Sequence, residues 1–180
     1  MRALAGEPLL SHTLRVASAS RYISRLIVST DDAEVAEVSR VCGAEVPFLR
    51  PPHLANDTVS QMDVVAHALE QIEGAGWGPV EVVVLLQPTS PLRSREDLDT
   101  TIGLILSGEA DSAISVGPAP AHPYYMYTVE ANTPVPLFPP PAGISRRQDF
   151  PEVWVRNGAV YAAKREVLAE TGTFYGKALR

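Results

Sequence analysis

The 180-residue sequence has one cysteine, four histidines and a net charge of −6, and each of these features excludes a class of protein. Cys42 cannot form an internal disulfide, and a small buried apolar residue is a better interpretation of it than a nucleophile. The 15 lysines and arginines form no basic stripe that could neutralise a phosphate backbone. The composition therefore argues against a nucleic-acid-binding protein.

Long apolar runs and common catalytic motifs are also missing. No stretch approaches the ~20 apolar residues of a transmembrane helix, and no signal-peptide pattern is present. The sequence contains no P-loop, no GxGxxG and no GxSxG motif, and its histidines lack metal-ligand spacing. We therefore expect a cytoplasmic protein with no membrane partner.

The most informative stretch runs from Val80 to Arg93. Six of the seven residues in 80–86 are apolar and mostly β-branched, which predicts a strand covered on both faces. Gln87-Pro88 ends this strand, and Ser94 begins a helix with Asp97 as its capping-box partner. Gln87 therefore follows the carboxyl end of a central strand, where open α/β sheets bind ligands. A simple turn is the alternative interpretation.

Alternating strand and helix patterns extend over most of the chain. We expect no strand in residues 1–10, short strands at 25–30 and 45–49, a helix capped by Asp31, and a strand at 111–116. Helix capping explains Asp31 better than the alternative, in which Asp31 and Asp32 together bind a metal ion. The pattern predicts an α/β fold of three layers with a mostly parallel sheet, formed by one domain over residues 1–180.

Residues 117–151 interrupt this alternation, because they hold nine of the sixteen prolines and three closely spaced tyrosines. Such an insertion is either a subunit contact or a solvated loop. After it, residues 153–162 predict a strand, a tight Asn157-Gly158 kink and a second strand, and a short helix follows at 164–170.

Two polar residues follow predicted strand ends and are candidates for ligand binding. Arg50 could hold a phosphate through a charge-assisted pair of hydrogen bonds. Gln87 carries both a donor and an acceptor and could bind a sugar hydroxyl or a carboxylate. A solvent-facing role for Arg50 is the alternative.

Five blocks of sequence resemble the acylneuraminate cytidylyltransferases, also called CMP-sialic acid synthetases. The block at 85–93, Leu-Leu-Gln-Pro-Thr-Ser-Pro-Leu-Arg, is similar to the signature of that family. The other blocks match in the same order and at similar spacing; they are residues 4–9, 27–31, 50–58 and 147–161. The resemblance covers essentially the whole chain and implies a Rossmann-like nucleotidyltransferase fold.

The resemblance implies an enzyme that transfers CMP from CTP to a nine-carbon acidic sugar such as N-acetylneuraminate, legionaminate or pseudaminate, and that requires Mg²⁺. By position, Arg50 and Ser60 would bind the nucleotide. The residues that would contact the sugar acid are Gln87, Asn157, Tyr161, Phe174 and Tyr175. The insertion at 117–151 would be exchanged between the subunits of a homodimer, so that Arg147 would act catalytically in the partner's site.

Two family segments have no counterpart in this sequence. The family begins with a strand and a glycine-rich basic loop around the CTP phosphates, and it continues into an aspartate-rich strand that holds Mg²⁺. We therefore expect the core of such an enzyme, truncated at both ends, without metal ligands and inactive as it stands. A non-catalytic remnant that only pairs with another subunit is the alternative from a different class.

Overall fold

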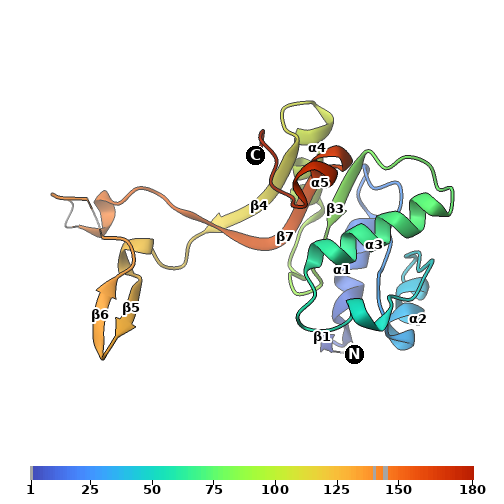
Figure 1. The fold of residues 1–180 in the computed structure, drawn as a ribbon, viewed down its shortest axis with the longest axis horizontal. Helices are drawn as coiled ribbons and strands as arrows, with labels where there is room; N and C mark the ends of the chain where they lie inside the picture. The colour runs from blue at the N-terminus through green and yellow to red at the C-terminus, as the bar shows by residue number, and fades with distance from the viewer. Residues whose placement is uncertain (1, 140, 144–145) are drawn as a thin grey trace. The chain divides into compact units, whose positions relative to one another are not determined.

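The computed structural model describes residues 2–139, 141–143 and 146–180. The chain forms two compact units (Figure 1): unit 1 comprises residues 1–115 and 158–180, and unit 2 comprises residues 116–157. Within the described ranges, no helix has the length and apolarity needed to span a membrane.

Unit 1 holds the five α-helices that the structure describes. They are α1 (Leu9–Ser18), α2 (Ala33–Val41), α3 (Gln61–Gly74), α4 (Arg95–Leu106) and α5 (Arg165–Thr171). Its main sheet has the strand order β3 (Val82–Leu85), β7 (Trp154–Lys164) and β4 (Ser112–Pro118), and the last two strands continue into unit 2.

The central strand β7 runs antiparallel to β3, with Val84 opposite Ala162. On its other side the backbone N–H of Lys164 donates to the carbonyl of Asp111 over 2.9 Å. The chain end adds a parallel bridge between Leu179 and Ser112 at the outer edge of β4. The sheet is therefore mixed, because an antiparallel strand separates β3 from β4.

Alternate side chains of the sheet point to two helical layers. On one face, Val83 of β3 and Ala163 of β7 belong to a hydrophobic cluster with residues of α3 and α5. On the other face, Val84 and Val160 pack with residues of α4 and α1. Successive residues of a strand point to opposite faces, and helices cover both faces of this sheet. The predicted three-layer α/β architecture is therefore confirmed.

Serine side chains cap two helix starts, and the cap of α2 differs from the sequence-based prediction. Ser60 Oγ accepts a hydrogen bond from the Asp63 N–H, and Ser94 forms a capping box with Asp97. The cap of α2 is Asp32 and not Asp31, because the extended backbone of Asp32 lets its carboxylate accept from two N–H groups of the first turn.

The N-terminal segment and the first two predicted strands also differ from expectation. Residues 3–8 form a small hairpin of β1 (Ala3–Leu4) and β2 (Glu7–Pro8), where no strand was predicted. Ala5 and Gly6 make its turn with φ angles of 51° and 85°. The predicted strands at 25–30 and 45–49 run parallel but pair only through an isolated bridge, Ile27 to Glu45.

The predicted division into two strands at Asn157-Gly158 is wrong, because β7 is one continuous strand through these residues. A hairpin would require residues 159–162 to pair with the residues just before the turn. Instead, Tyr161 and Ala162 pair with β3. Gly158 keeps a positive φ of 72°, which a strand tolerates at glycine.

Unit 2 is folded and is not a structureless loop. It contains an antiparallel hairpin of β5 (Tyr127–Glu130) and β6 (Thr133–Pro136), and two short 3₁₀ helices, η2 (Pro123–Tyr125) and η3 (Arg147–Asp149). An aromatic cluster surrounds η2: the ring of His122 lies 4.4 Å from Tyr124 and 4.9 Å from Phe150 between centroids. The nitrogens of His122 also engage the Tyr124 N–H and the Pro151 carbonyl, each at 3.2 Å.

Candidate active site

The turn that follows β3 is held in place by several contacts to Gln87. Its carbonyl accepts hydrogen bonds from the Ser90 N–H at 3.1 Å and from Nη2 of Arg93 at 2.9 Å. Its side-chain Nε2 donates to Oε1 of Gln61, the first residue of α3, at 3.1 Å. The turn after the strand is therefore fixed both through its backbone and through the amide of Gln87.

Gly158 of β7 makes room for the Gln87 side chain. A Cβ at this glycine would lie 2.9 Å from Oε1 of Gln87 and 3.4 Å from Oγ of Ser90. Its φ of 72° also disfavours any other residue type. The glycine is thus required both by the backbone and by the close approach of the Gln87 amide.

Arg93 lies beneath this turn and is 5% exposed. Besides the Gln87 carbonyl, its guanidinium contacts the carbonyl of Ala159 on β7 and Oγ1 of Thr13 on α1, the latter at 3.2 Å. Burial lowers the pKa of Arg93 from its usual range, because desolvation disfavours the charged form. The residue joins the turn to a strand and a helix that are distant in sequence.

Arg50 lies at the end of the second parallel segment and is half-buried, which does not fit a purely solvent-facing role. Its backbone N–H donates to the Thr30 carbonyl at 2.8 Å, and its Nη2 donates to the Ser29 carbonyl at 2.9 Å. Nε of Arg50 and Oγ of Ser29 are buried atoms without a hydrogen-bond partner among the described residues. Buried polar atoms of this kind are usually satisfied by water or a ligand.

The start of α3 connects these two groups. Nη1 of Arg50 lies 3.5 Å from the Leu54 carbonyl, in the loop that leads to Ser60. Gln61 follows Ser60 and accepts the hydrogen bond from Gln87. A helix N-terminus carries N–H groups and a partial positive charge that favour anions. The structure thus brings Gln61, the neighbour of Ser60, to Gln87 and links Arg50 to the start of α3 through one loop.

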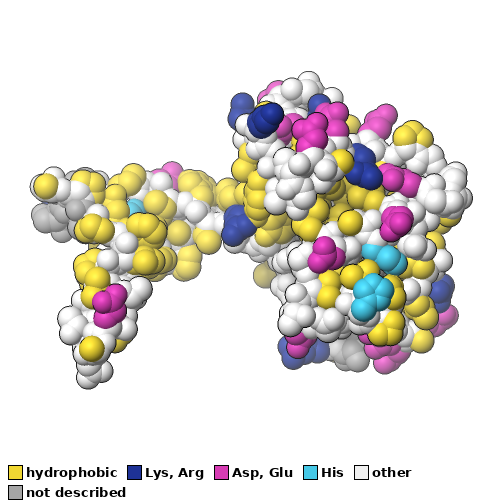
Figure 2. Space-filling view, viewed as in Figure 1, with side chains coloured by type: hydrophobic (Ala, Val, Ile, Leu, Met, Phe, Trp, Pro, Cys, Tyr) yellow, Lys and Arg dark blue, Asp and Glu magenta, His cyan; other side chains and the backbone are white. Residues whose placement is uncertain are grey.

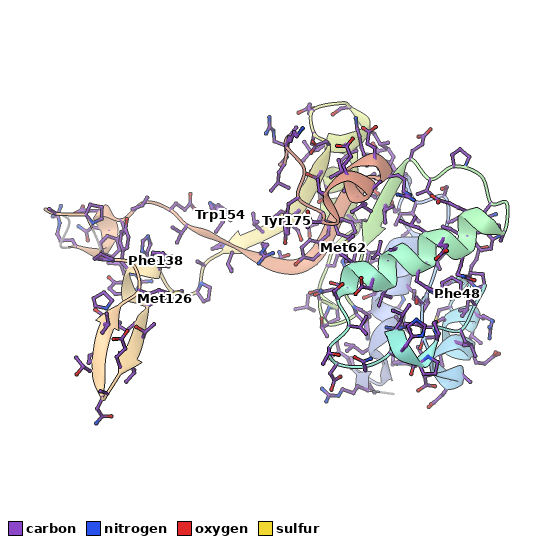
Figure 3. The ribbon with its side chains drawn as sticks, in the orientation of Figure 1. Phe48, Met62, Met126, Phe138, Trp154 and Tyr175 are labelled. Atoms are coloured by element: carbon purple, nitrogen blue, oxygen red, sulfur yellow. The ribbon has the colours of Figure 1, made fainter. Side chains whose placement is uncertain are left out.

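The predicted aromatic residues lie on the α3 side of the sheet. Tyr161 of β7 is opposite Leu85 in the strand register, and its ring lies 6.2 Å from that of Phe174. Phe174 is buried in the core and Tyr175 is 39% exposed. Figure 3 labels Met62, at the start of α3, and Tyr175, in the segment after α5. Tyr161 and Phe174 are therefore brought together, with Phe174 in a packing position.

The segment that carries Phe174 and Tyr175 is fixed by Asp111, which sequence reasoning did not select. Oδ2 of Asp111 accepts hydrogen bonds from the backbone N–H groups of Lys177 and Ala178, both at 3.0 Å. These hydrogen bonds lower the pKa of Asp111, and the bond from the Ala178 N–H has the largest effect. A Cβ on Gly176 would lie 2.2 Å from Oδ1 of Asp111, so the tail fits here only with glycine.

Two predicted residues belong to unit 2. Arg147 begins η3 and is exposed. Asn157 lies near Gly117, since a Cβ on that glycine would be 3.9 Å from Nδ2 of Asn157. The approach of either residue to Gln87 stays a prediction.

Sequence reasoning missed Gln61 and Ser29 as members of this site, and it placed Arg93 on the loop after the central strand without assigning it a role. The only available signal for Gln61 was its position directly after the capping serine. The described residues hold no group of three or more His, Cys, Asp or Glu side chains that could bind a metal. They therefore do not fit a magnesium site by themselves.

Comparisons with known proteins identify the family of this chain. The family profile described as "Cytidylyltransferase" matches residues 1–135. A CMP-N,N'-diacetyllegionaminic acid synthase of Legionella pneumophila is 30% identical over 98% of this chain and 75% of its own length. An N-acylneuraminate cytidylyltransferase A of Danio rerio is 31% identical over 98% of this chain and 40% of its own length.

Solved structures show the same fold. A CMP:2-keto-3-deoxy-manno-octonic acid synthetase complexed with CTP superposes with a TM-score of 0.65 at 18% identity, over 98% of this chain and 71% of the other. A 4-diphosphocytidyl-2C-methyl-D-erythritol synthase gives a TM-score of 0.65 at 10% identity, over 98% and 75%. With the profile match and the sequence relatives, these findings confirm the resemblance, and the chain belongs to the cytidylyltransferase family of nucleotidyltransferases.

Proposed function

We propose that the chain is the core of a cytidylyltransferase that transfers CMP from CTP to a nine-carbon acidic sugar and releases pyrophosphate. The observation that carries this proposal is the hydrogen bond between Gln87 and the first residue of α3. It brings a side chain suited to a sugar acid next to a helix N-terminus suited to a phosphate.

In this proposal the two halves of the site have separate roles. The nucleotide is held by Arg50, with its unsatisfied Nε, and by the start of α3 at Ser60. The sugar acid is held by Gln87 and Tyr161, with Phe174 supporting the tyrosine ring and Tyr175 beside it in sequence. The reaction is an attack of the sugar hydroxyl on the α-phosphorus, so catalysis rests mainly on positioning and on stabilisation of phosphate charge.

The identity of the acid is the next level of the proposal. The sequence relatives include proteins named for diacetyllegionaminic acid, N-acylneuraminate and pseudaminic acid. We propose a nine-carbon acid of this class, and a panel of N-acetylneuraminate, legionaminate and pseudaminate distinguishes among them. The family also implies Mg²⁺, and pyrophosphate release with and without EDTA tests that prediction.

We also propose that unit 2 pairs two copies of the chain and supplies Arg147 to the partner's site. Large hydrophobic side chains of unit 2 are exposed, including Met126 and Phe138 at the base of the β5–β6 hairpin (Figure 3). Figure 2 shows hydrophobic side chains gathered over the visible face of unit 2. Apolar patches with exposed aromatic residues are typical of protein–protein interfaces.

Titration with CTP, followed by measurement of pyrophosphate release with each acid, tests the function. We expect CTP binding and turnover with at least one of the three acids from the chain extended to the length of its relatives. The same assays on the 180-residue chain test the expectation that it is inactive as it stands. No CTP binding by the extended protein would contradict the proposal, and dimerisation without nucleotide binding would favour the non-catalytic alternative.

A further inference from the structure

Asp99 and Arg93 are the two charged side chains that are buried in the described part of the chain. Asp99 is compensated: it accepts a hydrogen bond from Ser20 Oγ at 2.6 Å, and the guanidinium groups of Arg21 and Arg95 lie 3.7 Å and 4.0 Å from its Oδ2. Arg93 lies within 4.0 Å of no carboxylate of the described residues, since none of the ion pairs includes it.

The partners of Arg93 are all neutral oxygens. They are the carbonyls of Gln87 and Ala159 and the hydroxyl of Thr13. These bonds satisfy donors of the guanidinium but leave its charge without a counter-ion. A buried charge without an opposite charge is costly, and proteins usually pair such groups.

The place of this charge is specific. Arg93 donates to the backbone carbonyl of Gln87, the residue whose side-chain amide faces Gln61 and Gly158. Its guanidinium therefore lies within one residue of the proposed sugar-acid site. Where few water molecules surround it, a positive charge attracts a nearby anion strongly, and dissolved salt screens that attraction only weakly.

We propose that Arg93 supplies the positive charge that selects a carboxylate-bearing ligand at the Gln87 turn. This inference rests on the proposed function and goes beyond it, because it assigns acid recognition to a buried residue that need not touch the ligand. Arg93 is then a residue that determines specificity through its field, and the bound carboxylate supplies the counter-ion that the fold lacks.

The test compares N-acetylneuraminic acid with its methyl ester, which keeps the sugar but removes the charge. Dissociation constants for both ligands are measured by calorimetry in the presence of CTP, for the wild-type chain and for Arg93→Gln, Arg93→Lys and Thr13→Val. In the wild type, the acid should bind more tightly than the ester. Arg93→Gln should reduce this acid-over-ester preference by about tenfold, the effect of one nearby charge.

Two control variants separate charge from structure. Arg93→Lys keeps the charge but has fewer donors, and Thr13→Val removes one neutral partner of Arg93 and leaves the charge. Both should retain the acid-over-ester preference within about threefold. An equal loss of acid and ester affinity in Arg93→Gln would show a purely structural role and overturn the inference.

Three further outcomes are decisive. If neither the wild type nor the chain extended to the length of its relatives binds either ligand, the proposed function fails, and the inference that rests on it fails as well. If the wild type binds acid and ester equally, the inference fails even where Arg93→Gln does not fold, which circular dichroism and thermal melting report. If Arg93→Gln loses affinity for CTP but keeps the acid-over-ester ratio, the charge acts on the nucleotide and not on the sugar acid. That result would overturn the inference.

Discussion

The side-chain amide of Gln87 donates a hydrogen bond to the amide oxygen of Gln61 over 3.1 Å. Gln87 follows strand β3 and Gln61 begins helix α3, so this bond joins the two halves of the proposed site. It uses one of the two N–H donors of the Gln87 amide.

Gln61→Ala should therefore weaken binding of the sugar acid by about three- to tenfold, the effect of losing a hydrogen bond of ~1 kcal/mol. The free energy of unfolding should change little, because Gln61 is exposed. Gln71→Ala, at another exposed glutamine of α3, is the matched control and should leave the affinity unchanged. Calorimetric titration measures both variants, and an unchanged affinity in Gln61→Ala would argue against an orienting role.

Gly158→Ala should destabilise the fold by about 1–3 kcal/mol, because it adds backbone strain and a contact with Gln87. Gly108→Ala is the control for strain alone: its φ is 82°, and a Cβ there would meet nothing within 4 Å. Urea unfolding should show a larger loss for Gly158→Ala than for Gly108→Ala. Equal losses would mean that the Gln87 side chain moves away freely.

Gly176→Ala should detach the segment that carries Tyr175 from Asp111, because the new Cβ would lie 2.2 Å from the carboxylate oxygen. We expect a loss of about 1–3 kcal/mol in the free energy of unfolding, as for other buried clashes. Gly74→Ala is the control, since nothing lies within 4 Å of a Cβ there. A Gly176→Ala variant as stable as the control would contradict the tight fit.

Asp111 should make the attachment of the tail dependent on pH. Its folded-state pKa lies below the ordinary value of 3.8, chiefly through the Ala178 N–H. Its contribution to stability is therefore complete above that ordinary value and is lost as the pH falls through the lowered one. Hydrogen exchange at the Lys177 and Ala178 amides should accelerate in that acid range. Asp111→Asn should already exchange quickly at neutral pH, and identical profiles would contradict this role.

Substitutions in unit 2 should prevent pairing of two chains if its apolar surface is the dimer contact. Val129→Asp is suitable because the side chain of Val129 is 71% exposed and the hairpin itself does not need it. We expect the mass measured by light scattering to fall from that of a dimer to that of a monomer. Val41→Asp, at a 79% exposed position on α2, is the control and should leave the mass unchanged.

Local signals in the sequence predicted those parts of the fold that depend on neighbouring residues. The capping box of Ser94 and Asp97 involves residues three positions apart, and the structure confirms it. The cap of α2 was misplaced by one residue because adjacent aspartates, Asp31 and Asp32, offer the same chemistry. Only the backbone conformation decides which of the two aspartates caps the helix.

Local sequence signals could not predict contacts between segments that are distant in the sequence. Asn157-Gly158 has the composition of a hairpin turn, but pairing of the following residues with β3 keeps β7 continuous. Arg93 follows a proline-rich turn and has the composition of an exposed loop residue. In the structure it is buried and donates a hydrogen bond to Thr13, which is 80 residues away in the sequence. The turn at Gln87 was thus predictable from the sequence, and the contacts that hold it were not.

The attachment of the last residue has a practical consequence. The N–H of Arg180 donates to the Ser112 carbonyl at 3.0 Å, and its carbonyl accepts from the Ile114 N–H at 2.9 Å. A purification tag or fluorescent label fused directly after Arg180 would start inside a hydrogen-bonded ladder, beside the segment that carries Phe174. A label for immobilisation or detection is better attached to an exposed residue of α2, because α2 is not part of this sheet edge.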